Sequence, residues 1–397
     1  MSCNKIWIND FDIQSPVIPI GRDITDTLFN PKENWVSKRQ FDFAALIGPY
    51  RKDVRRMNRT STLGYLSATS IMEKSGLAKE SFDPYGFGTV FSTTNASYES
   101  VLAVLNSLYQ KSIEDVSPIN FTYSVGNSLI SGITMKYGLK GPSTMLPSTE
   151  PLLVASMILE QEDAERILVG NYNICLDDNL NFYRQFDYLQ GDDQHFTGIL
   201  EAAKGMVIRE QAVSLVLESD AVHTGKEGCV LAGLSIKRKK KINSTLAQGQ
   251  MKNMTSAYDV NSFVELSHFS PEDFEETIKL ALSEAGVAAS QVDAVIMCSC
   301  GNPGLDNAEY KAVSSLIPDA KMVSVHGIFG SNFGSSFMLN CAVAVASLQK
   351  QMLPPSEGVI DSKGRFTTKT ESLNLKTVLV NGYNDLGNMI TGVIKWN

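Results

Sequence analysis

The stretch from Gly138 to Leu159 constrains the fold of this chain most. It opens with the turn sequence Gly138-Leu-Lys-Gly-Pro-Ser143 and ends in the apolar helical pattern Pro151-Leu-Leu-Val-Ala-Ser-Met-Ile-Leu159. We predict a turn, a short buried strand, a sharp elbow and then a buried helix. That geometry places one side chain, Glu150, at the positive end of the helix dipole.

The same stretch resembles the β-ketoacyl synthases of the thiolase fold. In that family the nucleophilic cysteine stands seven residues after the Gly-Pro-Ser turn, and here that position is Glu150. The resemblance implies that the elbow holds a carboxylate in place of a thiolate, since a helix N-terminus stabilises either anion. A carboxylate cannot form a durable thioester. The alternative interpretation is that Glu150 is an ordinary N-terminal charge on a buried helix.

The first of the family's two catalytic histidines is also replaced. Aligning the run Pro303-Gly-Leu-Asp-Asn-Ala-Glu309 with the family motif places Cys298 at the histidine position. A reactive cysteine needs a base, a cation or a helix N-terminus to lower its pKa, and none is evident in the sequence beside Cys298 or Cys300. We therefore expect both to be buried, unreactive thiols rather than a substitute nucleophile.

The positions of the family's second catalytic histidine and of its gating phenylalanine are altered as well. The run from His326 to Gly334 places Ser331 at the second histidine and His326 at a lysine of the family, with a register uncertain by one or two residues. The run Asn381-Gly-Tyr-Asn-Asp385 places Asp385 where the family has a gating phenylalanine. The resemblance thus implies degenerate catalytic positions at Glu150, Cys298 and Ser331, and no catalytic residue.

A segment of small, aromatic and apolar residues, from Ile119 to Met135, precedes the elbow. The resemblance places it beside the acyl tunnel and the dimer interface, with Phe121, Tyr123 and Asn127 as candidate tunnel contacts. An internal helix packed by small residues would have the same composition, because pocket walls and cores use similar residues.

Strand and helix patterns alternate along the whole chain, as an α/β protein with buried parallel strands requires. The clearest helix runs from Pro271 to Gly286, with Ser270 as its cap and acidic residues in its first turn. The resemblance implies a thiolase fold of two similar βαβαβ-type halves in a five-layer αβαβα arrangement. We expect the halves to be residues 1–245 and 246–397.

Composition excludes several classes of function. The 397 residues carry a net charge of −8, which argues against general nucleic-acid binding. The basic run Lys237-Arg-Lys-Lys-Lys241 fits a solvated loop, or a contact with an acidic carrier protein. No metal site or cofactor is expected, because the cysteines and the four histidines do not cluster. The absence of a signal peptide or a long apolar run predicts a cytoplasmic protein.

The changed catalytic positions within a retained ketosynthase framework, together with the run Pro303-Gly-Leu-Asp-Asn-Ala-Glu309, resemble chain-length factors. These are the non-catalytic subunits of type II polyketide synthases. The resemblance implies a heterodimer with an active β-ketoacyl synthase, a shared acyl tunnel whose depth sets chain length, and an acyl carrier protein that binds mainly through the partner. Those subunits usually have glutamine where Glu150 stands, and we favour the branch that serves aryl-polyene pathways.

Two other functions stay open at this stage. One is a priming enzyme that decarboxylates malonyl-carrier protein, against which the loss of both histidines counts. The other is new chemistry around Glu150, which would need a raised pKa to act as a base.

Overall fold

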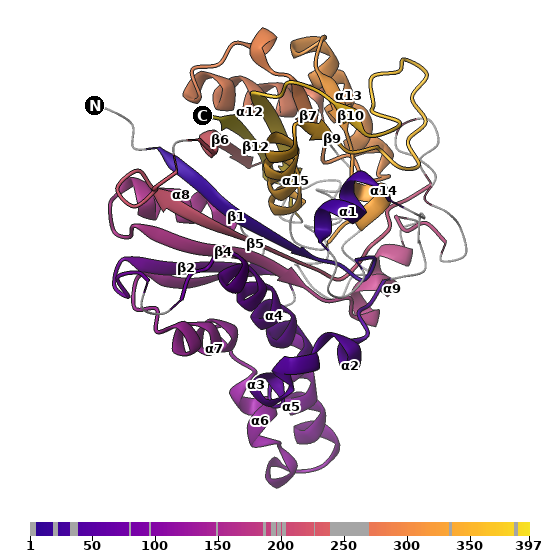
Figure 1. Ribbon diagram of the computed structural model, residues 1–397. Coiled ribbons are helices and arrows are strands. Elements are labelled where there is room, and N and C mark those ends of the chain that lie inside the picture. The colour runs from indigo at the N-terminus through magenta and orange to yellow at the C-terminus, as the bar shows by residue number, and fades with distance from the viewer. Residues whose placement is uncertain are drawn as a thin grey trace. The chain divides into compact units, whose positions relative to one another are not determined.

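The computed structural model describes residues 5–18, 23–31, 39–78, 81–94, 97–147, 150–185, 188–191, 196, 200, 204–225, 227–238, 270–332, 336–384 and 388–397. The chain divides into two compact units (Figure 1). The first unit comprises Met1–Ile24, Lys38–Leu176 and Arg209–Gly228. The second comprises Thr25–Ser37, Asp177–Ile208 and Cys229–Asn397. The predicted boundary between residues 245 and 246 lies outside the described residues.

The first unit is built on a sheet with the spatial strand order β3-β2-β4-β5-β1. Its strands are β1 (Ile6–Gln14), β2 (Phe87–Thr93), β3 (Ser143–Pro147), β4 (Arg166–Asn173) and β5 (Gln211–Ser219). Strand β2 pairs in parallel with β3 and β4, whereas β5 runs antiparallel to both β4 and β1. The carboxyl ends of β2, β3 and β4 therefore meet at one edge of this sheet.

Helices pack on this sheet, with α4 and α7 on one face and α8 on the other (Figure 1). The helices of the whole unit are α2 (Phe43–Leu46), α3 (Arg51–Val54), α4 (Arg59–Lys74), α5 (Tyr98–Gln110), α6 (Pro118–Thr122), α7 (Ser128–Tyr137) and α8 (Pro151–Glu160), with 3₁₀ turns η1 (Gly48–Tyr50) and η2 (Ile113–Asp115). Helix α4 begins directly after Asn58, which caps it by accepting the amide of Ser61 at 2.8 Å. Its apolar face, including Leu63 and Ile71, is fully buried.

The second unit carries a sheet with the order β6-β12-β11-β7-β8. Its strands are β6 (Cys229–Arg238), β7 (Ala294–Ile296), β8 (Lys321–Val323), β11 (Thr377–Tyr383) and β12 (Asn388–Trp396), with a separate ribbon of β9 (Met352–Leu353) and β10 (Glu371–Ser372). Its helices are α9 (Asp177–Gln185), α12 (Pro271–Glu284), η4 (Ala289–Gln291), α13 (Pro303–Leu316), α14 (His326–Phe329) and α15 (Phe337–Lys350), together with most of α1 (Ile24–Phe29). As predicted, Ser270 caps α12 and Gly286 follows it with a positive φ of 60°.

The two units repeat one topology. Counted along the chain within each unit, the strands lie in the spatial order third, second, fourth, fifth, first in both sheets. The pairings repeat too, because β7 is parallel to β8 and β11, and β12 is antiparallel to β11 and β6. The expected similarity of the two halves is therefore present in the fold, although no repeat is visible in the sequence.

Strand β3 corrects one sequence prediction. We expected a buried strand between the Gly-Pro-Ser turn and the elbow, but none of the five residues of β3 is buried, and Ser143 and Pro147 are exposed. The reason is its position, since β3 is the last strand in the spatial order and pairs only with β2. An apolar run such as Met145-Leu146 cannot reveal whether a second neighbour is present.

Candidate functional site

Glu150 stands at the N-terminus of α8, as predicted. Its side chain is completely buried, and Oε1 accepts a hydrogen bond from the amide of Leu152 at 3.4 Å. Pro151 occupies the first helical position, where the missing amide costs nothing. The carboxyl group thus lies where the helix dipole favours a negative charge, so both the N-cap interpretation and the family position describe the same geometry.

A buried polar cluster that the sequence did not reveal lies at the carboxyl ends of β2 and β4. Asn171 donates to Ser92 Oγ at 2.8 Å, and Asn173 donates to Asn171 Oδ1 at 3.0 Å. Asn173 in turn accepts the amide of Thr94 at 2.8 Å. Asparagines within an apolar strand pattern were the available signal, and parallel strand ends are the usual place for a site in such a sheet.

In the second unit two buried carboxylates on α13 hold the loop that follows β7. Asp306 accepts the amides of Cys300 and Gly301, each at 2.9 Å. Glu309 accepts the amide of Cys298 at 2.9 Å and the hydroxyl of Ser299 at 2.6 Å. Because residues three apart share a helix face, both carboxylates reach the same loop.

This loop keeps its two thiols protonated. Burial raises the pKa of Cys298 well above its usual range, and the neighbouring carboxylate of Glu309 raises it further. Burial, followed by the charge of Asp306, raises the pKa of Cys300 to about 12. Since the thiolate is the nucleophilic form, neither cysteine is activated at neutral pH.

Cys300 is the centre of a polar group that the sequence did not predict. Its sulfur lies 3.5 Å from the hydroxyl of Tyr383 and also makes a side-chain hydrogen bond with Ser331. Ser331 Oγ lies 3.3 Å from Nδ1 of His326. The structure therefore gathers Cys300, Ser331, His326 and Tyr383, while the thiol of Cys298 interacts with Glu309. Tyr383 belongs to the gate motif, but the motif directed attention to Asp385, which lies outside the described residues.

His326 is a buried, neutral imidazole. Its Nδ1 lies 3.0 Å from the carbonyl oxygen of Gly330, a contact that requires Nδ1 to carry the proton and donate it. Nε2 is buried and has no hydrogen-bond partner. Burial lowers the pKa of His326 to about 4, although the Gly330 carbonyl opposes that shift.

The predicted tunnel residues lie in the first unit, along α6 and α7. Asn127 lines a cavity of about 440 Å³ between α7 and β3, and a second of about 500 Å³ beside α3. Tyr123 lines the second of these. Phe121 is 66% exposed on α6, whereas Leu129 and Ile133 of α7 are buried, so only the α7 part of this segment is packed internally.

Within the described ranges, no group of three or more His, Cys, Asp or Glu side chains is arranged to hold a metal ion. None of the helices in the part of the chain that the structure describes has both the length and the apolar character needed to cross a bilayer.

Sequence profiles of two domains match most of the chain. The N-terminal domain of β-ketoacyl synthases matches residues 21–223, and the C-terminal domain matches residues 249–359. The chain belongs to the β-ketoacyl synthase family. A sequence comparison with curated proteins found no significant match.

Solved structures of ketosynthases share the fold of this family member. A β-ketoacyl synthase from Burkholderia phymatum STM815 matches with a TM-score of 0.81 and 14% identity over 99% of each chain. A type II polyketide synthase acyl-carrier protein in complex with its ketosynthase bound to the hexaketide (AntDE:AntF), and the ishigamide ketosynthase/chain length factor, each match with a TM-score of 0.78 and 14% identity over 99% of both chains. These likenesses confirm the thiolase fold predicted from the sequence.

The buried imidazole of this ketosynthase family member generates a prediction about acid stability. The unfolded chain protonates His326 below a pH of about 6.5, whereas the folded chain resists protonation down to a pH of about 4. The unfolded state therefore binds more protons as the pH falls through this window, and stability decreases. As the pH falls from about 6.5 to about 4, the free energy of unfolding of wild type should decrease by up to about 3 kcal/mol more than that of His326→Gln.

Urea unfolding of both proteins from pH 4 to 8 measures this difference. Between pH 7 and 8 both side chains are neutral, so the two stability curves should run in parallel there. Parallel curves across the whole range would mean that His326 is not held neutral by burial.

Proposed function

We propose that this protein is a non-catalytic chain-length-factor subunit. It pairs with an active β-ketoacyl synthase, and its side chains set the depth of an acyl tunnel at the interface. The observation that carries the proposal is Glu150, a buried carboxylate at the N-terminus of α8 where the family has its nucleophile. The aryl-polyene branch is the pathway we favour, on sequence resemblance.

The remaining chemistry of the second unit supports a subunit without its own condensing activity. Cys298 and Cys300 are protonated thiols, because burial and the carboxylates on α13 raise their pKa. Ser331, at the position of the second histidine, has a hydroxyl whose hydrogen bonds are made with Cys300 and His326. These groups supply neither an acyl-accepting nucleophile nor a pair of imidazole donors for a developing oxyanion.

Exposed apolar side chains of the first unit support the proposal that this protein binds a partner subunit. Nine of the thirteen exposed large apolar side chains in the described ranges lie on consecutive elements from α5 to α7, and we call them the 98–135 apolar surface. They are Tyr98, Leu105, Leu108, Tyr109, Ile113, Ile119, Phe121, Val125 and Met135. A large apolar surface of this kind is typical of an obligate interface. The edge strand β3, paired on one side only, follows directly along the chain.

Two cavities of the first unit support the proposal of an acyl tunnel. The cavity of about 440 Å³ is lined by residues of β3 and α7, including Asn127, Ile130 and Met145. Asn127 also lines the cavity of about 500 Å³, so one side chain borders both spaces. An acyl chain that enters from a partner would meet these walls, and their side chains would limit how far it extends.

Basic side chains support a contact with an acidic carrier protein. Lys52, Arg55 and Arg56 line the cavity of about 500 Å³ and are all exposed, in a chain whose net charge is −8. Local positive charge on an acidic protein attracts an acidic partner selectively. Of the basic run proposed from sequence, Lys237 forms ion pairs with Asp273 and Glu276, and residues 239–241 lie outside the described residues.

The first prediction concerns assembly. Co-expression with a ketosynthase that keeps its cysteine and both histidines should yield a one-to-one complex by size-exclusion chromatography. Phe121→Asp should weaken that complex by about tenfold or more, because it places a charge in an apolar interface. Leu280→Asp is the matched control, since Leu280 is 52% exposed on α12 and lies outside the 98–135 apolar surface. A stable homodimer that condenses acyl chains by itself would contradict the proposal.

The second prediction concerns chain length. Asn127→Trp should shift the products of the complex towards shorter chains, because the larger side chain reduces the space that Asn127 borders. Asn307→Trp is the control, an exposed asparagine on α13 that lines neither cavity. Mass spectrometry measures the product chain lengths of the complexes that contain either variant. An unchanged product distribution in Asn127→Trp would argue against a tunnel at this place.

The third prediction concerns Glu150. Glu150→Gln should leave elongation by the complex within about threefold of wild type, since the partner performs the chemistry. Glu150→Ala should cost about 1 kcal/mol of stability through the lost cap, without abolishing elongation. Complete loss of elongation in an intact complex would assign Glu150 a direct chemical role. Turnover of malonyl-carrier protein by the isolated chain would favour the decarboxylating enzyme instead.

A further inference from the structure

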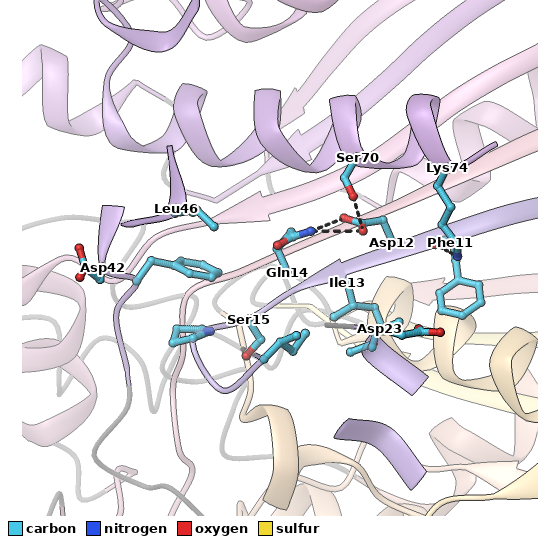
Figure 2. Close-up of a pocket in the computed structure, with 14 residues that line it drawn as sticks. Phe11, Asp12, Ile13, Gln14, Ser15, Asp23, Asp42, Leu46, Ser70 and Lys74 are labelled. Carbon is cyan, nitrogen blue, oxygen red and sulfur yellow. Dashed lines mark hydrogen bonds between the residues drawn. The ribbon is translucent and has the colours of Figure 1, made fainter. Parts of the chain in front are cut away.

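A cavity of about 540 Å³ lies in the first unit, away from the residues considered above (Figure 2). It borders the second half of β1, the turn that follows it, the start of α1, and parts of α2 and α4. Its apolar walls are formed by Phe11, Ile13, Ile18, Ile24, Phe41 and Leu46. Its volume lies in the range of about 300–1,000 Å³ that small-molecule sites occupy.

The polar lining of this cavity is rich in acidic side chains. Asp12, Asp23 and Asp42 line it, and among the described lining residues one ammonium group, that of Lys74, accompanies them. Lys74 Nζ lies 2.7 Å from Asp10 and 3.0 Å from the carbonyl oxygen of Phe11, so it is already engaged outside the cavity's carboxyl groups. The described lining therefore offers carboxyl groups to a ligand that carries donors.

The hydrogen-bond donors of the lining are directed at Asp12. Gln14 Nε2 donates to both of its oxygens, at 3.0 and 3.2 Å, and Ser70 donates at 2.9 Å (Figure 2). Ser67 donates a further bond at 3.1 Å from within the core. Because the nitrogen of the Gln14 amide faces Asp12, its oxygen faces away as an acceptor. Burial still raises the pKa of Asp12, and a nearby cation would favour its charged form.

Ser15 supplies the second, independent sign of a ligand. It lines the cavity, its exposed fraction is 1%, and its hydroxyl has no hydrogen-bond partner. A buried hydroxyl without a partner costs about 1–3 kcal/mol, so proteins rarely leave one unmatched. A donor group on a bound molecule would remove this cost.

We propose that this cavity binds a small organic amine. The lining offers acceptors at Ser15 and Gln14 and carboxyl groups at Asp12 and Asp42, while the donors of Gln14, Ser70 and Lys74 are engaged. A ligand ammonium group supplies both the donors and the positive charge that this arrangement lacks. The hydrocarbon part of the ligand packs against the apolar walls.

Isothermal titration calorimetry of the full chain tests this inference with three molecules of similar shape. Phenethylamine, which is a cation at pH 7, should bind at least about tenfold more tightly than phenethyl alcohol, because a hydrogen bond to a charged group is the stronger one. Phenylacetate should not bind detectably. Equal binding of the amine and the alcohol, or no saturable binding of the amine, would overturn the proposal.

Two variants locate the site. Ser15→Ala should weaken phenethylamine binding by about tenfold through the lost acceptor. Leu46→Trp should abolish binding by filling the cavity, without altering the groups around Asp12. Ser347→Ala is the matched control, because Ser347 is also a buried serine without a partner but lies on α15 in the second unit. Wild-type affinity in Ser15→Ala or Leu46→Trp, or an equal loss in Ser347→Ala, would refute the assignment.

Discussion

Two buried carboxylates on α13 hold the functional region of the second unit together. Asp306 and Glu309 are fully buried and accept the backbone amides of the loop after β7. Without them these amides would be buried and unsatisfied, at about 1–3 kcal/mol each. Burial raises the pKa of both Cys298 and Cys300, and the nearby charges of Glu309 and Asp306 raise it further. These carboxylates therefore have a folding role that does not depend on any catalytic activity of the loop.

The first unit also contains a buried carboxylate that is compensated by the backbone, in this case by a helix N-terminus. Glu150 is the N-cap of α8, and the helix dipole and the Leu152 amide compensate its burial. In both units the side chains of interest follow the carboxyl ends of parallel strands, because both sheets have the same strand order. A helix N-terminus stabilises a thiolate or a carboxylate, since each is an anion. The proposed replacement of the nucleophile by Glu150 would therefore require no change of fold.

Local signals explain which predictions succeeded. Ser270, the predicted cap of α12, accepts a hydrogen bond from the amide three residues ahead, so a short sequence window contains the whole interaction. Strand β3 failed as a buried strand because its burial depends on neighbours that a window cannot show. The contact of Cys300 with Tyr383 joins residues 83 apart in sequence, and an alignment anchored on Pro303 directed attention to Cys298 instead.

The sequence by itself determined the family, which the sequence profiles confirm, because family motifs depend on residue types at fixed spacing. It also determined that Glu150 precedes a helix, since Pro151 and the apolar run after it are local signals. Only the tertiary structure decided that Cys300 contacts Ser331, that His326 is neutral and that Ser15 lines a cavity without a partner. It also decided that the 98–135 apolar surface is exposed. Burial and hydrogen-bond partners arise from segments far apart in the chain, and no pattern of neighbouring residues encodes them.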